Sequence, residues 1–156
     1  MANQRIEPKR INPTGVSVAA IIEKNGSLLC VRQKSTKDQK WSIPAGHLKS
    51  GEMILDGVKR EIKEETGYDI SLFGLVGIYN RSKEGGTRLA FVFTACIVGG
   101  QENPRPQEIA EIRWFDRDEI SDLIISQKLY RPEYSARVLM DWVSGIIYPL
   151  DVFKEI

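Results

Sequence analysis

The chain has 156 residues, 42% of them hydrophobic and 28% charged, and a formal net charge of +1. This length suits one domain that buries a core without disulfides, and the nearly balanced charge disfavours duplex nucleic acid as the main partner. No stretch approaches the ~18 consecutive apolar residues of a membrane span, and the first residues lack the apolar segment of a secretion signal. We therefore expect a cytoplasmic protein without a membrane partner, either a monomer or a homodimer.

The first part of the chain predicts two strands and a helix. Residues 1–12 are expected to form a flexible polar tail, and residues 13–156 a single domain. Strands are predicted at residues 15–23 and 28–32, joined by a hairpin turn at Asn25-Gly26. A polar loop then leads to a helix at about residues 53–66, for which Gly67 is the natural C-terminal cap.

The second part of the chain continues this mixture of strands and helices. Alternating and apolar runs predict strands at residues 72–79, 88–98 and 112–115. Helical spacing predicts helices at residues 116–123 and 132–145. Because strands and helices alternate, the sequence predicts an α/β layered domain.

The two cysteines lie singly in strand-like apolar runs, at Cys30 and Cys96. No Cys-x-x-Cys pair or histidine cluster accompanies them. Buried, reduced thiols are therefore expected in place of a disulfide or a zinc site.

The predicted helix at residues 53–66 carries three glutamates, Glu61, Glu64 and Glu65, at steps of one, three and four residues. Residues at steps of three and four are neighbours on a helix surface, so these carboxylates repel one another. Oxygen ligands of this kind suit a hard divalent cation. Taken alone, however, the three glutamates are more typical of a solvated helix face.

The residues around these glutamates favour the cation site. The segment from residue 46 to residue 68 resembles the Nudix box, in which a glycine, a glutamate and an Arg-Glu-apolar-x-Glu-Glu-x-Gly run stand at fixed spacing. The matching residues are Gly46, Glu52, Arg60, Glu61, Ile62, Glu64, Glu65 and Gly67. At ordinary residue usage, seven specified positions coincide by chance with a probability on the order of 10⁻⁸. Tyr68 stands where the pattern prefers an aliphatic residue, which leaves the chemistry unchanged.

The resemblance implies a Nudix-type α/β/α sandwich around a mixed β-sheet, with a loop-helix-loop motif. It also implies hydrolysis of a nucleoside diphosphate linked to another group, with Mg²⁺ or Mn²⁺ as cofactor. By position, the metal ligands would be Glu61, Glu64 and Glu65, with Glu52 as a further ligand or supporting group. Arg60 would hold a carboxylate in place. The two glycines would act through their backbones, Gly46 in a tight loop and Gly67 at a positive φ.

Outside the box, the resemblance suggests a further carboxylate near the metal, for which Glu108 is a better candidate than Glu111. The predicted catalytic residues are then Arg60, Glu64, Glu65 and Glu108. Cations and aromatic residues on the strands are candidates for substrate binding, although core or surface roles are more usual for each. The selected candidates are Arg32, Trp41, Tyr79 and Arg88.

The substrate stays open at this stage. Pro44 to Leu48 and the tail from Ser144 to Asp151 resemble the bacterial Nudix phosphatases that act on nucleoside di- and triphosphates and on hydroxymethylpyrimidine pyrophosphate. A small phosphorylated molecule of this kind is therefore expected first, ADP-ribose or another nucleotide sugar second, and an oxidised nucleotide third. The alternative from another class is a non-catalytic Nudix module that binds or senses a ligand, and such modules usually lose box carboxylates that this chain keeps.

Overall fold

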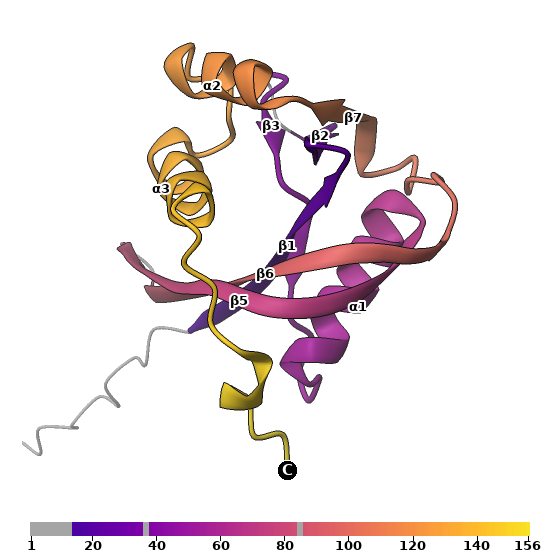
Figure 1. Ribbon diagram of the computed structural model, residues 1–156. Helices are drawn as coiled ribbons and strands as arrows, with labels where there is room; N and C mark the ends of the chain where they lie inside the picture. Colours follow the sequence, from indigo (N-terminus) through magenta and orange to yellow (C-terminus); the bar gives the residue numbers. More distant parts are fainter. Residues whose placement is uncertain (1–13, 36–37, 84–85) are drawn as a thin grey trace, which may run out of the picture.

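A computed structural model describes residues 14–35, 38–83 and 86–156 of the chain (Figure 1). The proposed tail at residues 1–12 lies outside this description. The strands are β1 (Gly15–Lys24), β2 (Ser27–Gln33), β3 (Trp41–Ser42), β4 (Ala45–His47), β5 (Tyr68–Lys83), β6 (Gly86–Gly100) and β7 (Ile109–Phe115). The helices are α1 (Ile54–Thr66), α2 (Arg117–Ile125), α3 (Pro132–Val143) and a short 3₁₀ turn at Leu150–Val152. No helix within the described ranges is long and apolar enough to cross a membrane.

The strands form one mixed sheet in the order β3-β2-β1-β6-β5, to which β4 adds beside β1 and β7 beside β2. The central pair, β1 and β6, is parallel and places Val18 opposite Phe91. The other strand pairs are antiparallel. This arrangement confirms the mixed sheet expected from the sequence.

Helices cover both faces of the sheet (Figure 1). Because side chains alternate along a strand, β1 sends Val18, Ala20 and Ile22 to one face and Ala19 and Ile21 to the other. The first face packs against α1 and the C-terminal segment, and the second packs against α2 and α3. Strand β1 is therefore buried on both sides, and the α/β/α sandwich is confirmed.

Helix α1 forms where the sequence predicts it. Val58 and Ile62 are fully buried against the sheet, which leaves the glutamates on the neighbouring side of the helix. The helix ends at Gly67, whose φ of 83° is left-handed. A Cβ atom there would lie 2.3 Å from the carbonyl oxygen of Gln101, so glycine is required by space as well as by conformation.

Strands β5 and β6 extend further than the sequence predicted, over 16 and 15 residues. The added residues 80–83 of β5 are all polar, so they lack the alternation of apolar side chains that predicts a strand. Register shifts between Leu72 and Gly74 and between Leu75 and Gly77 also interrupt the period-two pattern of β5. The C-terminal segment pairs with the middle of β5, since Leu75 and Tyr148 exchange two backbone hydrogen bonds of 2.8 Å. This contact carries the end of the chain across the sheet toward α1 (Figure 1).

The two thiols differ in their environment. Cys30 is buried as expected, and burial raises its pKa to about 12. The prediction was wrong for Cys96, which is exposed on β6 and donates a weak hydrogen bond to the carbonyl oxygen of Ser71. The apolar run around Cys96 predicted burial, but the Cys96 side chain lies on the solvent-facing side of β6.

We expect one thiol per native chain to react with a thiol reagent such as dithionitrobenzoate at pH 8, and two in denaturant. Cys96 is accessible, whereas Cys30 stays protonated and covered. The Cys96→Ser variant is the matched control and should show no rapid reaction in the native state. Rapid reaction of that variant would contradict the burial of Cys30.

Candidate active site

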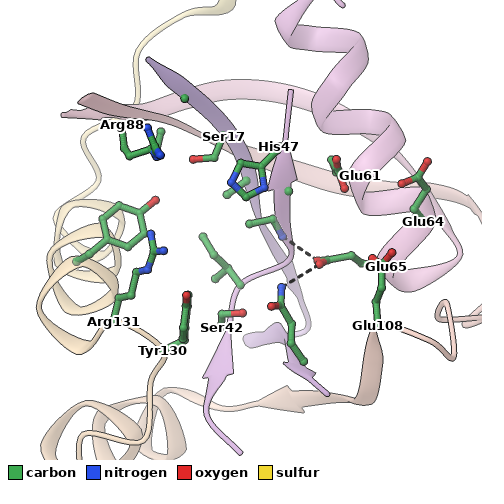
Figure 2. A pocket seen from close by; sticks show the side chains of 18 of the residues that line it. Ser17, Ser42, His47, Glu61, Glu64, Glu65, Arg88, Glu108, Tyr130 and Arg131 are labelled. Atoms are coloured by element: carbon green, nitrogen blue, oxygen red, sulfur yellow. Dashed lines mark hydrogen bonds between the residues drawn. The ribbon is translucent and has the colours of Figure 1, made fainter. Parts of the chain in front are cut away.

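A cavity of about 480 Å³ lies between α1, the central strands and the start of α3 (Figure 2). Carboxylates line one side and cations and aromatic rings line the other (Figure 2). The polar and charged residues of the acidic side are Gln33, Lys49, Arg60, Glu61, Glu64, Glu65, Arg105 and Glu108. The opposite side includes Arg81, Arg88, Tyr130, Arg131 and Tyr134.

Glu65 is the most enclosed carboxylate of the site, with only 3% of its surface exposed. It accepts hydrogen bonds from the backbone N–H of Ala45 at 2.8 Å and from the amide of Gln33 at 3.2 Å (Figure 2). Burial and, to a smaller extent, the charge of Glu61 raise the pKa of Glu65 to about 8, although the two hydrogen bonds act in the opposite direction. A nearby cation would therefore stabilise the ionised form of the Glu65 carboxyl group.

Arg60 ties the other glutamates together. Its guanidinium donates to Glu52 at 2.5 and 2.8 Å, to Glu61 at 2.7 Å and to Glu64 at 3.2 Å. It also donates to the carbonyl oxygen of His47 at 3.1 Å, which links α1 to the end of β4. The positioning role expected for Arg60 stays a prediction, and these contacts are the ones that such a role requires.

Glu52 lies beside the site without lining the cavity. The hydrogen bond from Arg60 and the one from the backbone N–H of Lys49 lower the pKa of Glu52 to about 2. Both oxygens of Glu52 accept hydrogen bonds, so this carboxylate orients Arg60 and the backbone of Lys49. Of the two roles expected for Glu52, this geometry favours support over direct ligation.

Gly46 is needed because Glu61 passes directly over it. A Cβ atom at residue 46 would lie 2.0 Å from Cδ of Glu61. Gly46 belongs to β4, where it pairs with Val18. The expected backbone role therefore comes from close approach of a side chain, and the tight loop proposed from the sequence is replaced here by a short strand.

Glu64 on α1 and Glu108 beside β7 both lie on the acidic side of the cavity (Figure 2). Arg105 connects them, contacting Glu64 at 3.0 Å and Glu108 at 2.8 Å. Glu108 lines the cavity directly before β7, whereas Glu111 lies outside the cavity and pairs with Arg32 at 2.7 Å. The structure thus brings Glu108, and not Glu111, to the carboxylates of the box.

Among the residues predicted to bind substrate, the cavity includes only Arg88. Trp41 packs edge-to-face on Phe115, 4.8 Å away, and Arg32 lies over the ring of Trp41. Tyr79 donates its hydroxyl to Asp141 at 3.0 Å in a neighbouring groove. The structure therefore places Arg32, Trp41 and Tyr79 outside the cavity.

The sequence interpretation did not select several residues that line the cavity. They are Gln33, Lys49, Arg105, Tyr130, Arg131 and Tyr134. Lys49 lies within the box at a position that the pattern leaves unspecified, whereas the others belong to segments distant from the box, to which no local spacing connects them. Only the pairing of β2 with β7 and the position of α3 bring them to the same cavity.

The carboxylates of α1 fit a hard divalent cation by their chemistry, since they offer only oxygen donors. Within the described part of the chain, no three acidic, histidine or cysteine side chains converge as a preformed ligand cluster. Arg60 and Arg105 instead occupy oxygens of Glu61 and Glu64. Of these glutamates, Glu61, Glu64 and Glu65 line the cavity and would hold the cation.

We expect the free energy of unfolding of the metal-free protein to fall as pH rises from about 5 to 8. The pKa of Glu65 in the folded protein is about 8, above its usual value of 4.5. The contribution of the protonated Glu65 to the free energy of unfolding is therefore complete below pH 4.5 and is lost as the pH rises through 8. Denaturant unfolding in EDTA measures the effect. The Glu65→Gln variant should lack this component, and an unchanged pH dependence would contradict it.

We expect Gly46→Ala to lower the free energy of unfolding by about 1–3 kcal/mol, the usual cost of overpacking. The new methyl group would displace Glu61 from Arg60. Gly99→Ala is the matched control, because a Cβ atom there meets Asp69 at an ordinary 3.6 Å. Equal stability of the two variants in denaturant unfolding would contradict the close approach.

Comparison with known proteins agrees with this geometry. The NUDIX domain family matches residues 12–138. The ADP-ribose pyrophosphatase of Methanocaldococcus jannaschii is 29% identical over 133 residues, which cover 83% of this chain and 75% of that protein. A MutT-like protein of Streptomyces ambofaciens is 33% identical over 108 residues, covering 69% of this chain and 67% of that protein.

The fold comparison gives the same answer. The solved structure of a NUDIX hydrolase from Nitrosomonas europaea matches with a TM-score of 0.79 and 31% identity. The match covers 92% of this chain and 98% of that one. The chain therefore belongs to the Nudix family and is a Nudix hydrolase, an enzyme that cleaves pyrophosphate linkages.

Proposed function

We propose that the enzyme hydrolyses a nucleoside di- or triphosphate, or a related small pyrophosphate, with Mg²⁺ or Mn²⁺ held by Glu61, Glu64 and Glu65. The observation that carries this proposal is the buried carboxyl of Glu65 beside two further carboxylates on one wall of the cavity. Arg60 and Arg105 pair with Glu61 and Glu64, whereas Glu65 accepts hydrogen bonds from the neutral donors Ala45 and Gln33, so a metal cation would stabilise its ionised form. A pyrophosphate brought to the same cation would be neutralised there.

The cation would supply charge neutralisation at the phosphates and would favour ionisation of a nearby water. The chain's own residues provide the rest. Arg60 keeps Glu61 and Glu64 in place, and the backbone N–H of Ala45 fixes the orientation of Glu65. Lys49 and Arg105 line the same wall and add positive charge for phosphate oxygens.

Glu108 is the proposed general base. It lies at the edge of the cavity, and it is exposed enough to exchange a proton with solvent. Its pairing with Arg105 links it to Glu64 through one side chain. A carboxylate in this position would accept the proton of the water that attacks phosphorus.

ADP-ribose is the second candidate substrate. The relative from Methanocaldococcus jannaschii carries the name ADP-ribose pyrophosphatase. A cavity of about 480 Å³ is within the usual range for a ligand of nucleotide size, and its two tyrosines provide aromatic surface for a base or sugar. The same carboxylates would serve either substrate, so the choice depends on the opposite wall.

We expect Glu65→Gln to lower kcat/KM by a factor of about 10³ or more, since the swap removes a charge that faces the cation. Glu108→Gln should lower it by a factor of about 10² to 10⁴. Glu111→Gln is the matched control outside the cavity and should keep full activity. Steady-state hydrolysis with Mg²⁺ or Mn²⁺ measures all three, and equal activity of Glu65→Gln and Glu111→Gln would overturn the assignment.

The substrate is identified by a panel of nucleotides, nucleotide sugars and small pyrophosphates, assayed in ¹⁸O-labelled water. The proposal expects metal-dependent turnover, with the label in one product and the other product free of it. Position of the label identifies the phosphorus that is attacked. Absence of turnover across the panel with both metals would count against the proposed substrate class.

A further inference from the structure

The wall of the cavity opposite the glutamates gathers three arginines, Arg81, Arg88 and Arg131. Arg81 on β5 and Arg88 on β6 are direct partners in the antiparallel register. Like charges directly opposite each other on neighbouring strands are destabilising. A negatively charged group beside Arg81 and Arg88 would reduce this repulsion.

Arg131 adds a third positive charge from another element. It precedes α3 in a left-handed conformation, with a φ of 50°. This conformation is uncommon for a residue with a side chain. Burial lowers the pKa of Arg81, and the positive charge of Arg131 lowers it further.

In the part of the chain that the structure describes, carboxylates do not pair with Arg81 or Arg131. The carboxylates that line the cavity are Glu61, Glu64, Glu65 and Glu108, and Figure 2 shows them across from Arg88 and Arg131. Asp141, in the neighbouring groove, already accepts from Tyr79 and Arg137.

Arg81 also has an unused hydrogen-bond donor. Its Nε is buried and has no hydrogen-bond partner among the described residues. Its guanidinium lies over the ring of Tyr134, 5.4 Å from the centroid, which holds the side chain at the cavity wall. Buried polar groups in proteins are usually paired, so an unpaired guanidinium nitrogen beside a cavity indicates a missing acceptor.

We propose that Arg81, Arg88 and Arg131 bind a second phosphate group of the substrate, separate from the pyrophosphate held at the glutamates. This inference rests on the proposed function and narrows it to a pyrophosphate that carries a further phosphate. A phosphate offers about two negative charges and three acceptor oxygens, which suits three guanidinium groups. A neutral base or sugar would leave the charges of Arg81 and Arg131 without a negatively charged partner among the described residues.

The test compares compounds that differ by one phosphate group: NADPH with NADH, coenzyme A with dephospho-coenzyme A, and a nucleoside triphosphate with its diphosphate. Binding is measured by calorimetry with Mg²⁺ on the Glu65→Gln protein, and hydrolysis on the active enzyme. We expect at least one phosphorylated member to bind about tenfold more tightly than its partner, the usual scale for charge-assisted hydrogen bonds.

The same comparison is made in Arg81→Gln and Arg131→Gln, each added to both proteins. We expect each to remove most of the preference while binding of the unphosphorylated partner changes little. Arg117→Gln on α2, outside the cavity, is the matched control and should keep the preference. Melting temperatures identify any variant that fails to fold, and the other arginine variant then decides the result.

Equal binding within all three pairs, or a preference that persists in both arginine variants, would overturn the inference. Hydrolysis without such a preference leaves the proposed function standing and removes only the arginine site. A binding preference without any turnover gives the opposite result, because it supports the arginine site and contradicts the proposed hydrolysis.

Discussion

The site depends on the hydrogen bonds that Arg60 makes with Glu52, Glu61 and Glu64. Carboxylates on one face of a short helix repel one another, and the guanidinium allows them to stay together before any cation arrives. The same side chain reaches the backbone of His47 and so fixes α1 to β4. Glu65 then completes the connection by accepting from Ala45 on that strand. Helix and sheet are thus joined by the polar groups that form the site.

The two chemically different walls of the cavity follow from the two strands that pair with β1. The parallel pairing of β1 with β6 puts Gly15 beside Arg88, while the antiparallel pairing of β1 with β4 puts Ser17 beside His47. The cationic wall and the acidic wall are therefore both anchored on β1. A substrate that spans the cavity would contact a metal site at one end and arginines at the other, so cleavage and selection can be carried by different residues.

Much of the fold and the acidic half of the site could be predicted from the sequence, because both depend on local spacing. The positions of Glu61, Glu64 and Glu65 on one helix follow from helical geometry, and Gly67 ends that helix as expected. Of the cationic half, the sequence indicated only Arg88, because the grouping of Arg81 and Arg131 with it depends on the pairing of two long strands and on the position of α3. Arg81 meets Arg88 beyond residue 79, where the sequence prediction ended the strand. Tyr79, two residues away on the same face of an ideal strand, instead reaches Asp141 of α3.

The most direct measurement is a crystal structure of the enzyme soaked in Mn²⁺, with anomalous scattering used to locate the ion. The proposed mechanism predicts an anomalous peak within about 2.0–2.6 Å of oxygens from Glu61, Glu64 or Glu65, the usual range for carboxylate ligands of divalent cations. It also predicts that Arg60 keeps its contact with Glu52. An ion bound elsewhere in the cavity, in an enzyme that Mn²⁺ activates, would contradict the assignment of these glutamates as its ligands.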